Sequence, residues 1–268
     1  MKILVLGDVM GASGRNALNK KLPQIINSNA IDFIIVNGEN SADDGKGITQ
    51  DIAEEFFKIG VDVITSGNHI WDKQETANYI NIENRLLRPA NLVEGSPGRG
   101  YEKYFTKNKK YKIGVVNLMG NVFMRKTEDV FQEAKKISKK MVLKKDVDFI
   151  VVDFHGEITS EKMAIGHFFD GQVTCVVGTH THVPTADTRV LDNGTAYQTD
   201  IGMCGDYNSV IGMNKENSIK RFLKDKDAVK HFPAVGEGTL SGIIVETNTE
   251  TGLAKNVVRL IDGGSLIK

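Results

Sequence analysis

Apolar runs alternate with amphipathic stretches along the first third of the chain. Residues 14–28, for example, carry leucine and isoleucine at helical spacing, and Thr49 can cap a second helix that Gly60 ends. Strands are predicted at 2–6, 33–36 and 61–65, and helices at 14–28, between Thr49 and Gly60, and at 72–80. Continuous apolar strands separated by helices indicate a largely parallel sheet covered on both faces.

After Pro89 the pattern changes and hairpins appear between further strand and helix segments. Asn193-Gly194, between two alternating runs, is a strong signal for a tight hairpin. The predicted elements are a hairpin over 101–105 and 111–118, a helix over about 127–143, a strand at 148–154, a helix at 159–168, a strand at 172–178, a hairpin over 188–200, and a closing hairpin over 238–247 and 254–261. No linker interrupts them, so we expect a single domain over 1–268 with a second, more antiparallel sheet against the first.

Composition narrows the function classes. The chain has 268 residues with 34 basic and 34 acidic side chains, so net charge gives no argument for a nucleic-acid or membrane surface. The lysine-rich stretch 135–145 is typical of an amphipathic surface helix. Without a secretion signal or an apolar run of membrane-spanning length, we expect a cytoplasmic protein. Cys175 and Cys204 fit no zinc pattern, and no disulfide between them is expected.

Five apolar runs each end in side chains that commonly bind ligands. These are Asp8, Glu39-Asn40, Asn68-His69, His155 and the segment Gly178–His182. The carboxyl ends of strands are where sites gather in α/β proteins. Together the runs offer carboxylates, amides and four imidazoles, a set that suits two adjacent ions of the Mn, Fe or Zn type.

Each cluster alone also has a structural interpretation, since Gly-Asp and Gly-Asn pairs are common in turns. His180 and His182 lie two residues apart in a segment expected to be extended, so both imidazoles should face the same side. The coincidence of five such clusters at strand ends favours the metal site. His167 and His231 have no such partners and are interpreted as structural.

The order of these motifs resembles that of the calcineurin-like metallophosphoesterases. It is most similar to their YmdB-like branch, whose members act as 2',3'-cyclic nucleotide phosphodiesterases. The likeness covers nearly the whole chain and includes LLRPAN (86–91), PGRG (97–100) and residues 200–213. The superfamily usually has Asp-x-His and Gly-Asp where this chain has Asp8-Val9-Met10 and Gly38-Glu39-Asn40. Both departures are the expected pattern in the YmdB-like branch, with Asn40 in place of the missing histidine.

The resemblance implies a fold and a ligand set. The fold is an αββα sandwich of two mixed sheets flanked by helices. One metal would be held by Asp8, Glu39, Asn40 and His182, and the other by Glu39, Asn68, His155 and His180, with Glu39 as the bridge. His69 is implied as the proton donor. The ions would be divalent or mixed-valence iron, with manganese or zinc as alternatives, and a hydroxide bridging them would attack the phosphorus.

The leading hypothesis is therefore a metal-dependent phosphodiesterase for small 2',3'-cyclic nucleotides. Alternatives are an RNA nuclease, or a regulatory protein with residual phosphodiesterase activity. A nuclease would need a basic groove with aromatic stacking platforms, and this chain has one tryptophan and no net positive charge. We expect no membrane association and no stable nucleic-acid complex, and a homo-oligomer is compatible with the sequence. Candidates for lining the substrate pocket, with loop structure as the alternative, are Arg88, Asn91, Asp206 and Tyr207.

Overall fold

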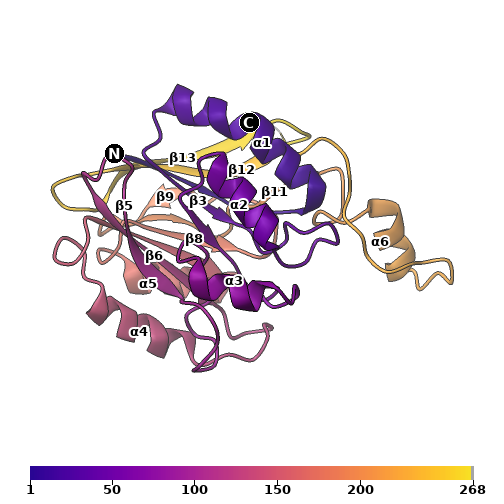
Figure 1. The fold of residues 1–268 in the computed structure, drawn as a ribbon, viewed down its shortest axis with the longest axis horizontal. Helices are drawn as coiled ribbons and strands as arrows, with labels where there is room; N and C mark the ends of the chain where they lie inside the picture. Colours follow the sequence, from indigo (N-terminus) through magenta and orange to yellow (C-terminus); the bar gives the residue numbers. More distant parts are fainter. Residues whose placement is uncertain (267–268) are drawn as a thin grey trace.

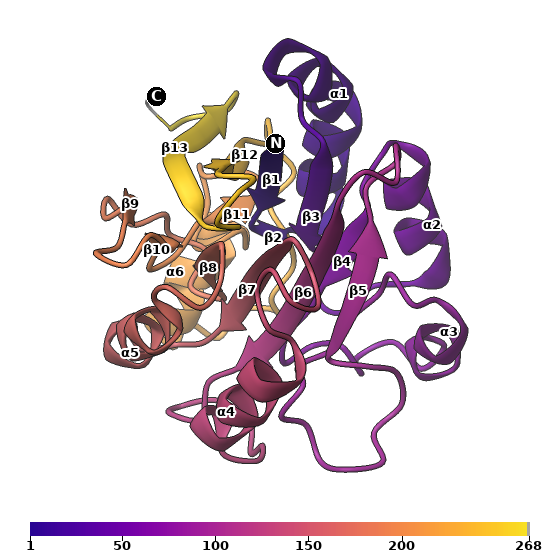
Figure 2. The same ribbon diagram turned by 90° about the vertical axis from the view of Figure 1, so that its left-hand side faces the viewer.

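Two β-sheets lie face to face between outer helices in the computed structural model, which describes residues 1–266 (Figures 1 and 2). The first sheet has the strand order β13-β12-β1-β3-β4, in which β1, β3 and β4 run parallel. Its strands are β1 (Lys2–Leu6), β3 (Phe33–Asn37), β4 (Val63–Thr65), β12 (Leu240–Thr247) and β13 (Ala254–Asp262).

The second sheet has the strand order β5-β6-β7-β8-β10-β9. Its strands are β5 (Tyr101–Phe105), β6 (Lys112–Met119), β7 (Phe149–His155), β8 (Cys175–Thr179), β9 (Arg189–Val190) and β10 (Ala196–Gln198). A short parallel pair, β2 (Asp8–Val9) with β11 (Met203–Cys204), lies directly beyond the end of β1. No pattern in the sequence predicts this pair.

Alternating side chains of the strands build three apolar layers. Ile3 and Val5 of β1 point between the sheets, whereas Leu4 and Leu6 point outward to α1 (Gly11–Asn29) and α2 (Gln50–Lys58). The outer face of the second sheet packs in the same way on α4 (Val130–Lys140) and α5 (Thr159–Phe169). The remaining helices are α3 (Thr76–Ile82) and α6 (Lys215–Phe222), and α6 lies at one end of the molecule in Figure 1.

Most predicted elements are present. The three hairpins form, and the Thr49 side chain accepts a hydrogen bond from the backbone N–H of Ile52 at the start of α2. The helix predicted at 72–80 is wrong in its first half, because residues 68–75 form turns and bends and α3 begins only at Thr76. The described helices include none that combines the length and the apolar character needed to cross a bilayer.

The expectation that the second sheet would be the more antiparallel one is wrong. The closing hairpin joins the first sheet, because β12 pairs antiparallel with β1 along the full length of β1. In the second sheet β6, β7, β8 and β10 are successively parallel, and only the edge strands β5 and β9 pair antiparallel. Hydrophobic periodicity identifies strands, but it does not show which distant strand becomes the neighbour.

Candidate metal centre

The predicted site residues lie where strands of both sheets end. Asp8 follows β1, Glu39 and Asn40 follow β3, and Asn68 follows β4. From the second sheet, His155 is the last residue of β7, and the segment His180–His182 follows β8. The carboxyl ends of parallel strands from the two facing sheets therefore meet. The residues of the five motifs come together at this place.

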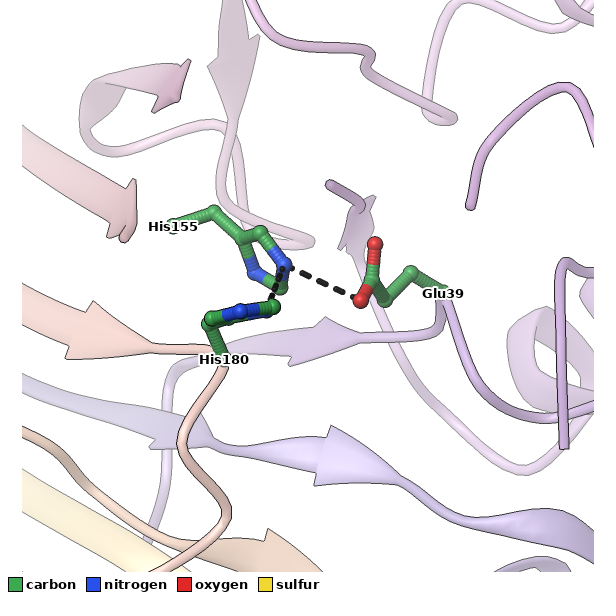
Figure 3. A group of neighbouring side chains, drawn as sticks. All are labelled: Glu39, His155 and His180. Carbon is green, nitrogen blue, oxygen red and sulfur yellow. Dashed lines mark hydrogen bonds and ion pairs between the residues drawn. The ribbon is translucent and has the colours of Figure 1, made fainter. Parts of the chain in front are cut away.

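One part of the site is centred on His155, whose side chain is fully buried (Figure 3). Its Nε2 lies 3.0 Å from Glu39 Oε1, 3.1 Å from Asn68 Oδ1 and 3.1 Å from His180 Nδ1. A single ring nitrogen carries at most one proton, so it cannot satisfy all these neighbours together. A cation placed among the four atoms would be a common partner for them all, and Glu39, His155 and His180 have the spacing of metal ligands.

Hydrogen bonds behind His155 set its tautomer. The Thr179 hydroxyl donates to Asp153 Oδ1 over 2.7 Å, and the same oxygen lies 2.9 Å from His155 Nδ1. Because that hydroxyl has only one proton, it accepts from His155 Nδ1–H. The lone pair needed for metal binding is thereby directed to Nε2, the usual role of a partner behind a ligand histidine. The roles of Asp153 and Thr179 were not among the predictions from the sequence, although a carboxylate inside the apolar strand FIVVDFH is a visible signal.

The other part contains Asp8, Asn40 and His182. His182 Nε2 lies 3.2 Å from Asn40 Oδ1 and 4.0 Å from Asp8 Oδ1, while its Nδ1–H donates to the carbonyl of Ile211 over 2.8 Å. Within the described chain, Asp8 Oδ1 is buried and has no hydrogen-bond partner. Leaving such an oxygen unpaired is costly unless an ion binds it. The donors present thus fit two cations that prefer oxygen and imidazole ligands.

Charges in this buried cluster are strongly coupled. Burial raises the pKa of Asp8 to about 6, although the nearby imidazoles oppose the shift. Burial also opposes ionisation of Glu39, but the charge and hydrogen bond of His155 outweigh it and lower the Glu39 pKa to about 2. Burial disfavours the charged form of His155, but the negative charge of Glu39 outweighs burial and raises the His155 pKa to about 9. For His180, burial and the positive charge of His155 both act in the same direction and lower its pKa to about 3. Without an ion, a proton on His155 therefore balances the carboxylates.

His69 lies beside this cluster with a different set of contacts. Its backbone N–H donates to Glu39 Oε2 over 3.1 Å, and its ring Nδ1 lies 2.8 Å from Asp72 Oδ2. One fifth of the His69 side chain is exposed. Asp72 also lies 3.4 Å from an Arg125 nitrogen. Because Asp72 contacts Nδ1, the other ring nitrogen, Nε2, is left for proton exchange. Asp72 could have been noted from the sequence, since it lies three residues after His69.

The segment expected to be extended around His180 is not extended. His180 and His182 adopt φ angles of 97° and 66°, in the left-handed region. A left-handed residue that is not glycine costs about 1–2 kcal/mol, so other interactions must hold this segment. The two imidazoles reach different neighbours, His155 and Asn40 respectively, and do not extend side by side from one strand face.

The four candidates for the pocket lining have structural roles. Each uses its side chain to hold loop or strand backbone. Arg88 donates to the carbonyls of Pro89, Ala90 and Pro97, Asn91 exchanges hydrogen bonds with the backbone of Met119, Asp206 accepts from the backbone of Asn208 and Gly236, and the Tyr207 hydroxyl bonds the backbone of Met203.

Comparisons with known proteins agree with this geometry. The chain is 42% identical over 261 residues to the 2',3'-cyclic-nucleotide 2'-phosphodiesterase of Bacillus subtilis (strain 168), with 97% of each chain covered. It superimposes on a crystal structure of a novel phosphatase from Mycoplasma pneumoniae with a TM-score of 0.89 and 36% identity, covering 98% of this chain and 94% of that one.

A more distant likeness concerns the fold alone. The 5'-nucleotidase of Candida albicans SC5314 matches with a TM-score of 0.55 and 14% identity over 97% of this chain and 51% of that one. The architecture is that of the calcineurin-like metallophosphoesterases. The chain belongs to the YmdB-like protein family, whose model matches residues 4–260. Family and fold are thus as the sequence motifs predicted.

Proposed function

We propose that this chain hydrolyses 2',3'-cyclic nucleotides at a site holding two transition-metal ions. It is a phosphoric diester hydrolase. The observation that carries the two-metal proposal is the convergence of Glu39, Asn68 and His180 within 3.1 Å of His155 Nε2, close to a buried Asp8 oxygen that has no hydrogen-bond partner among the described residues. The similarity to the Bacillus subtilis enzyme supports the choice of substrate.

The ligands divide into two overlapping sets. Asp8, Glu39, Asn40 and His182 would hold one ion, and Glu39, Asn68, His155 and His180 the other. When bound, such a pair of ions activates water and stabilises negative charge on the phosphoryl oxygens. Iron is the leading candidate, and manganese and zinc fit the same donors. Because both sheets supply ligands, we also propose that the chain acts as one domain.

The protein's own groups complete the proposed chemistry. Glu39 would be shared by the two ligand sets. One of its carboxylate oxygens lies 3.0 Å from His155 Nε2, and the other accepts a hydrogen bond from the His69 backbone N–H. That hydrogen bond fixes the His69 backbone next to the metal site. The His69 imidazole, oriented by Asp72, then donates a proton to the ribose oxygen that leaves phosphorus.

Turnover measurements on metal-loaded protein test this proposal. We expect 2',3'-cyclic AMP to be hydrolysed far faster than a short single-stranded RNA without a cyclic phosphate end. Efficient cleavage of the RNA with no turnover of the cyclic nucleotide would replace the proposal by the nuclease alternative. Elemental analysis of the same preparation identifies the metal and its stoichiometry.

A further inference from the structure

A buried ion pair lies behind the metal site and has no part in the chemistry described so far. Lys162 of α5 places its Nζ 2.6 Å from Asp200 Oδ2, and each side chain is only 1% exposed. Removing two charges from water is costly, so such a pair is weak evidence for stability as such. Its contacts show what else it does.

The Asp200 carboxylate holds the backbone between two proposed metal ligands. Its Oδ2 accepts from the Thr181 backbone N–H over 3.1 Å and from the Thr181 hydroxyl over 2.7 Å, in addition to Lys162. Thr181 separates His180 from His182, the two residues with left-handed φ angles. The carboxylate therefore holds the chain between its two strained residues.

The segment that carries Asp200 is also tied to the end of β8 by a backbone hydrogen bond. Asp200 Oδ1 accepts from Gly202 N over 2.8 Å, and Ile201 N donates to the carbonyl of Gly178 over 2.9 Å. A Cβ on Gly178 would lie 1.8 Å from the Thr199 carbonyl oxygen and 3.0 Å from Lys162 Cδ. The end of β8, the segment 199–202 and the Lys162 stem are thus in close contact and have little freedom to shift.

We propose that Lys162 and Asp200 are positioning residues that hold His180 and His182 in the orientation required by the two metal ions. This inference rests on the proposed function. Asp200 accepts hydrogen bonds from the backbone and the hydroxyl of Thr181. Lys162 holds the Asp200 carboxylate in place and balances its negative charge. Neither residue is one of the proposed metal ligands.

Titration of metal-free protein with Mn²⁺ tests the inference without measuring activity. The variants are Asp200→Asn and Lys162→Met, and each should lower Mn²⁺ affinity at least about tenfold, as loss of a partner behind a metal ligand commonly does. The direction in which Lys162→Met changes Mn²⁺ affinity distinguishes positioning from a charge effect. If the pair acted only through its charge, removing a nearby cation would raise Mn²⁺ affinity, while Asp200→Asn would lower it.

Two further variants separate positioning from folding. Thr181→Val removes only the hydrogen bond from the Thr181 hydroxyl to Asp200 and keeps the one from the backbone. This variant should fold normally and lose less Mn²⁺ affinity than Asp200→Asn. Asp206→Asn changes another buried carboxylate, one that holds the Asn208 and Gly236 backbone and contacts no proposed ligand. It should lower the melting temperature of the metal-free protein and leave Mn²⁺ affinity unchanged.

The outcomes distinguish this inference from the proposed function. If wild-type protein binds Mn²⁺ and the Lys162, Asp200 and Thr181 variants bind it equally well, the positioning role is wrong and the two-metal proposal stands. Opposite effects of Lys162→Met and Asp200→Asn would also overturn positioning in favour of a charge effect. Wild-type protein that binds neither Mn²⁺ nor any other transition metal would overturn both.

Discussion

The two parts of the proposed metal centre differ in how close together their donor atoms lie. In the His155 half, formed by Glu39, Asn68, His155 and His180, three donor atoms lie within 3.1 Å of His155 Nε2. In the His182 half, which contains Asp8, Asn40 and His182 and shares Glu39, the Asp8 oxygen lies 4.0 Å from His182 Nε2. The four donors of the His155 half thus lie close together before any ion binds. In the His182 half, Asn40 Oδ1 lies 3.2 Å from His182 Nε2, but Asp8 is farther from that nitrogen.

The difference follows from the elements that carry the histidines. His155 is the last residue of β7, paired with β6 on one side and β8 on the other, and its ring is held by Thr179. His182 lies beyond a left-handed turn, and its ring is held by the carbonyl of Ile211 in a loop. Preorganised donors bind with less loss of conformational freedom. We therefore expect the His155 half to bind its ion more tightly.

Glu39→Ala should have the largest effect, because it removes the one residue shared by both halves. We expect both ions to be lost and turnover of 2',3'-cyclic AMP to fall to background. Elemental analysis and a turnover assay measure the two effects. Asp43→Ala, which removes an exposed carboxylate on the same segment, should retain both ions. Retention of one full equivalent by Glu39→Ala would show that Glu39 does not bridge.

His69→Ala should impair catalysis without disturbing metal binding in either half. If His69 protonates the leaving ribose oxygen, its loss should lower turnover of a cyclic nucleotide by about 10²–10⁴-fold. The loss should shrink on a nitrophenyl phosphodiester, whose leaving group departs without a proton. Equal losses on both substrates would refute the proton-donor role, and His231→Ala, at an exposed histidine, is the matched control.

Thr179→Val tests what preorganises the His155 half. The substitution removes the hydroxyl that sets the His155 tautomer, so affinity for the ion in that half should fall by about 10–100-fold. Thr174→Val is a matched control next to the other end of β8, where the buried hydroxyl donates to the Gly252 carbonyl. Both variants should lose stability, but a loss of Mn²⁺ affinity in both alike would contradict a specific role for Thr179.

The pH dependence of stability should also distinguish the His155 half. The folded-state pKa of His155 is about 9, above its ordinary value of 6.5. The stabilisation of the folded state by the proton on His155 is therefore fully present below pH 6.5 and is lost as the pH rises through 9. We expect the free energy of unfolding of metal-free protein, measured by urea unfolding, to fall by about 3 kcal/mol across this window.

Two controls accompany that measurement. His155→Gln should remove the dependence, and His167→Gln, at an exposed position, should retain it. Protein saturated with metal should also lack it, because the ion takes the place of the proton. A metal-free wild-type protein whose stability is flat from pH 6.5 to 9 would contradict the charge arrangement described for this half.

The sequence predicted the strands better than their neighbours. Apolar runs and Asn193-Gly194 identify strands and a hairpin because these are local features. The pairing of β12 with β1 joins residues some 240 positions apart, and no local pattern specifies it. The two-residue strands β2 and β11 and the exposed helix α6 likewise lack a periodic apolar signal of sufficient length.

The candidate site shows the same division. The predicted ligands gather because each follows a strand, and strand ends can be located from the sequence. The groups that hold them could not be predicted in the same way, since Asp153 reaches Thr179 and Asp200 reaches Thr181 only through the folded chain. The left-handed turn at His180 was missed because that conformation is imposed by such contacts and contradicts the local preference of the residue.

Anomalous diffraction from crystals soaked in Mn²⁺ tests the two-metal centre most directly. At limiting Mn²⁺ we predict one peak bound by His155 Nε2 and Glu39. At excess Mn²⁺ a second peak should appear beside Asp8 and His182, about 3.5–4 Å from the first and sharing the Glu39 carboxylate. A single peak at saturation, or two peaks of which neither contacts Glu39, would contradict the account.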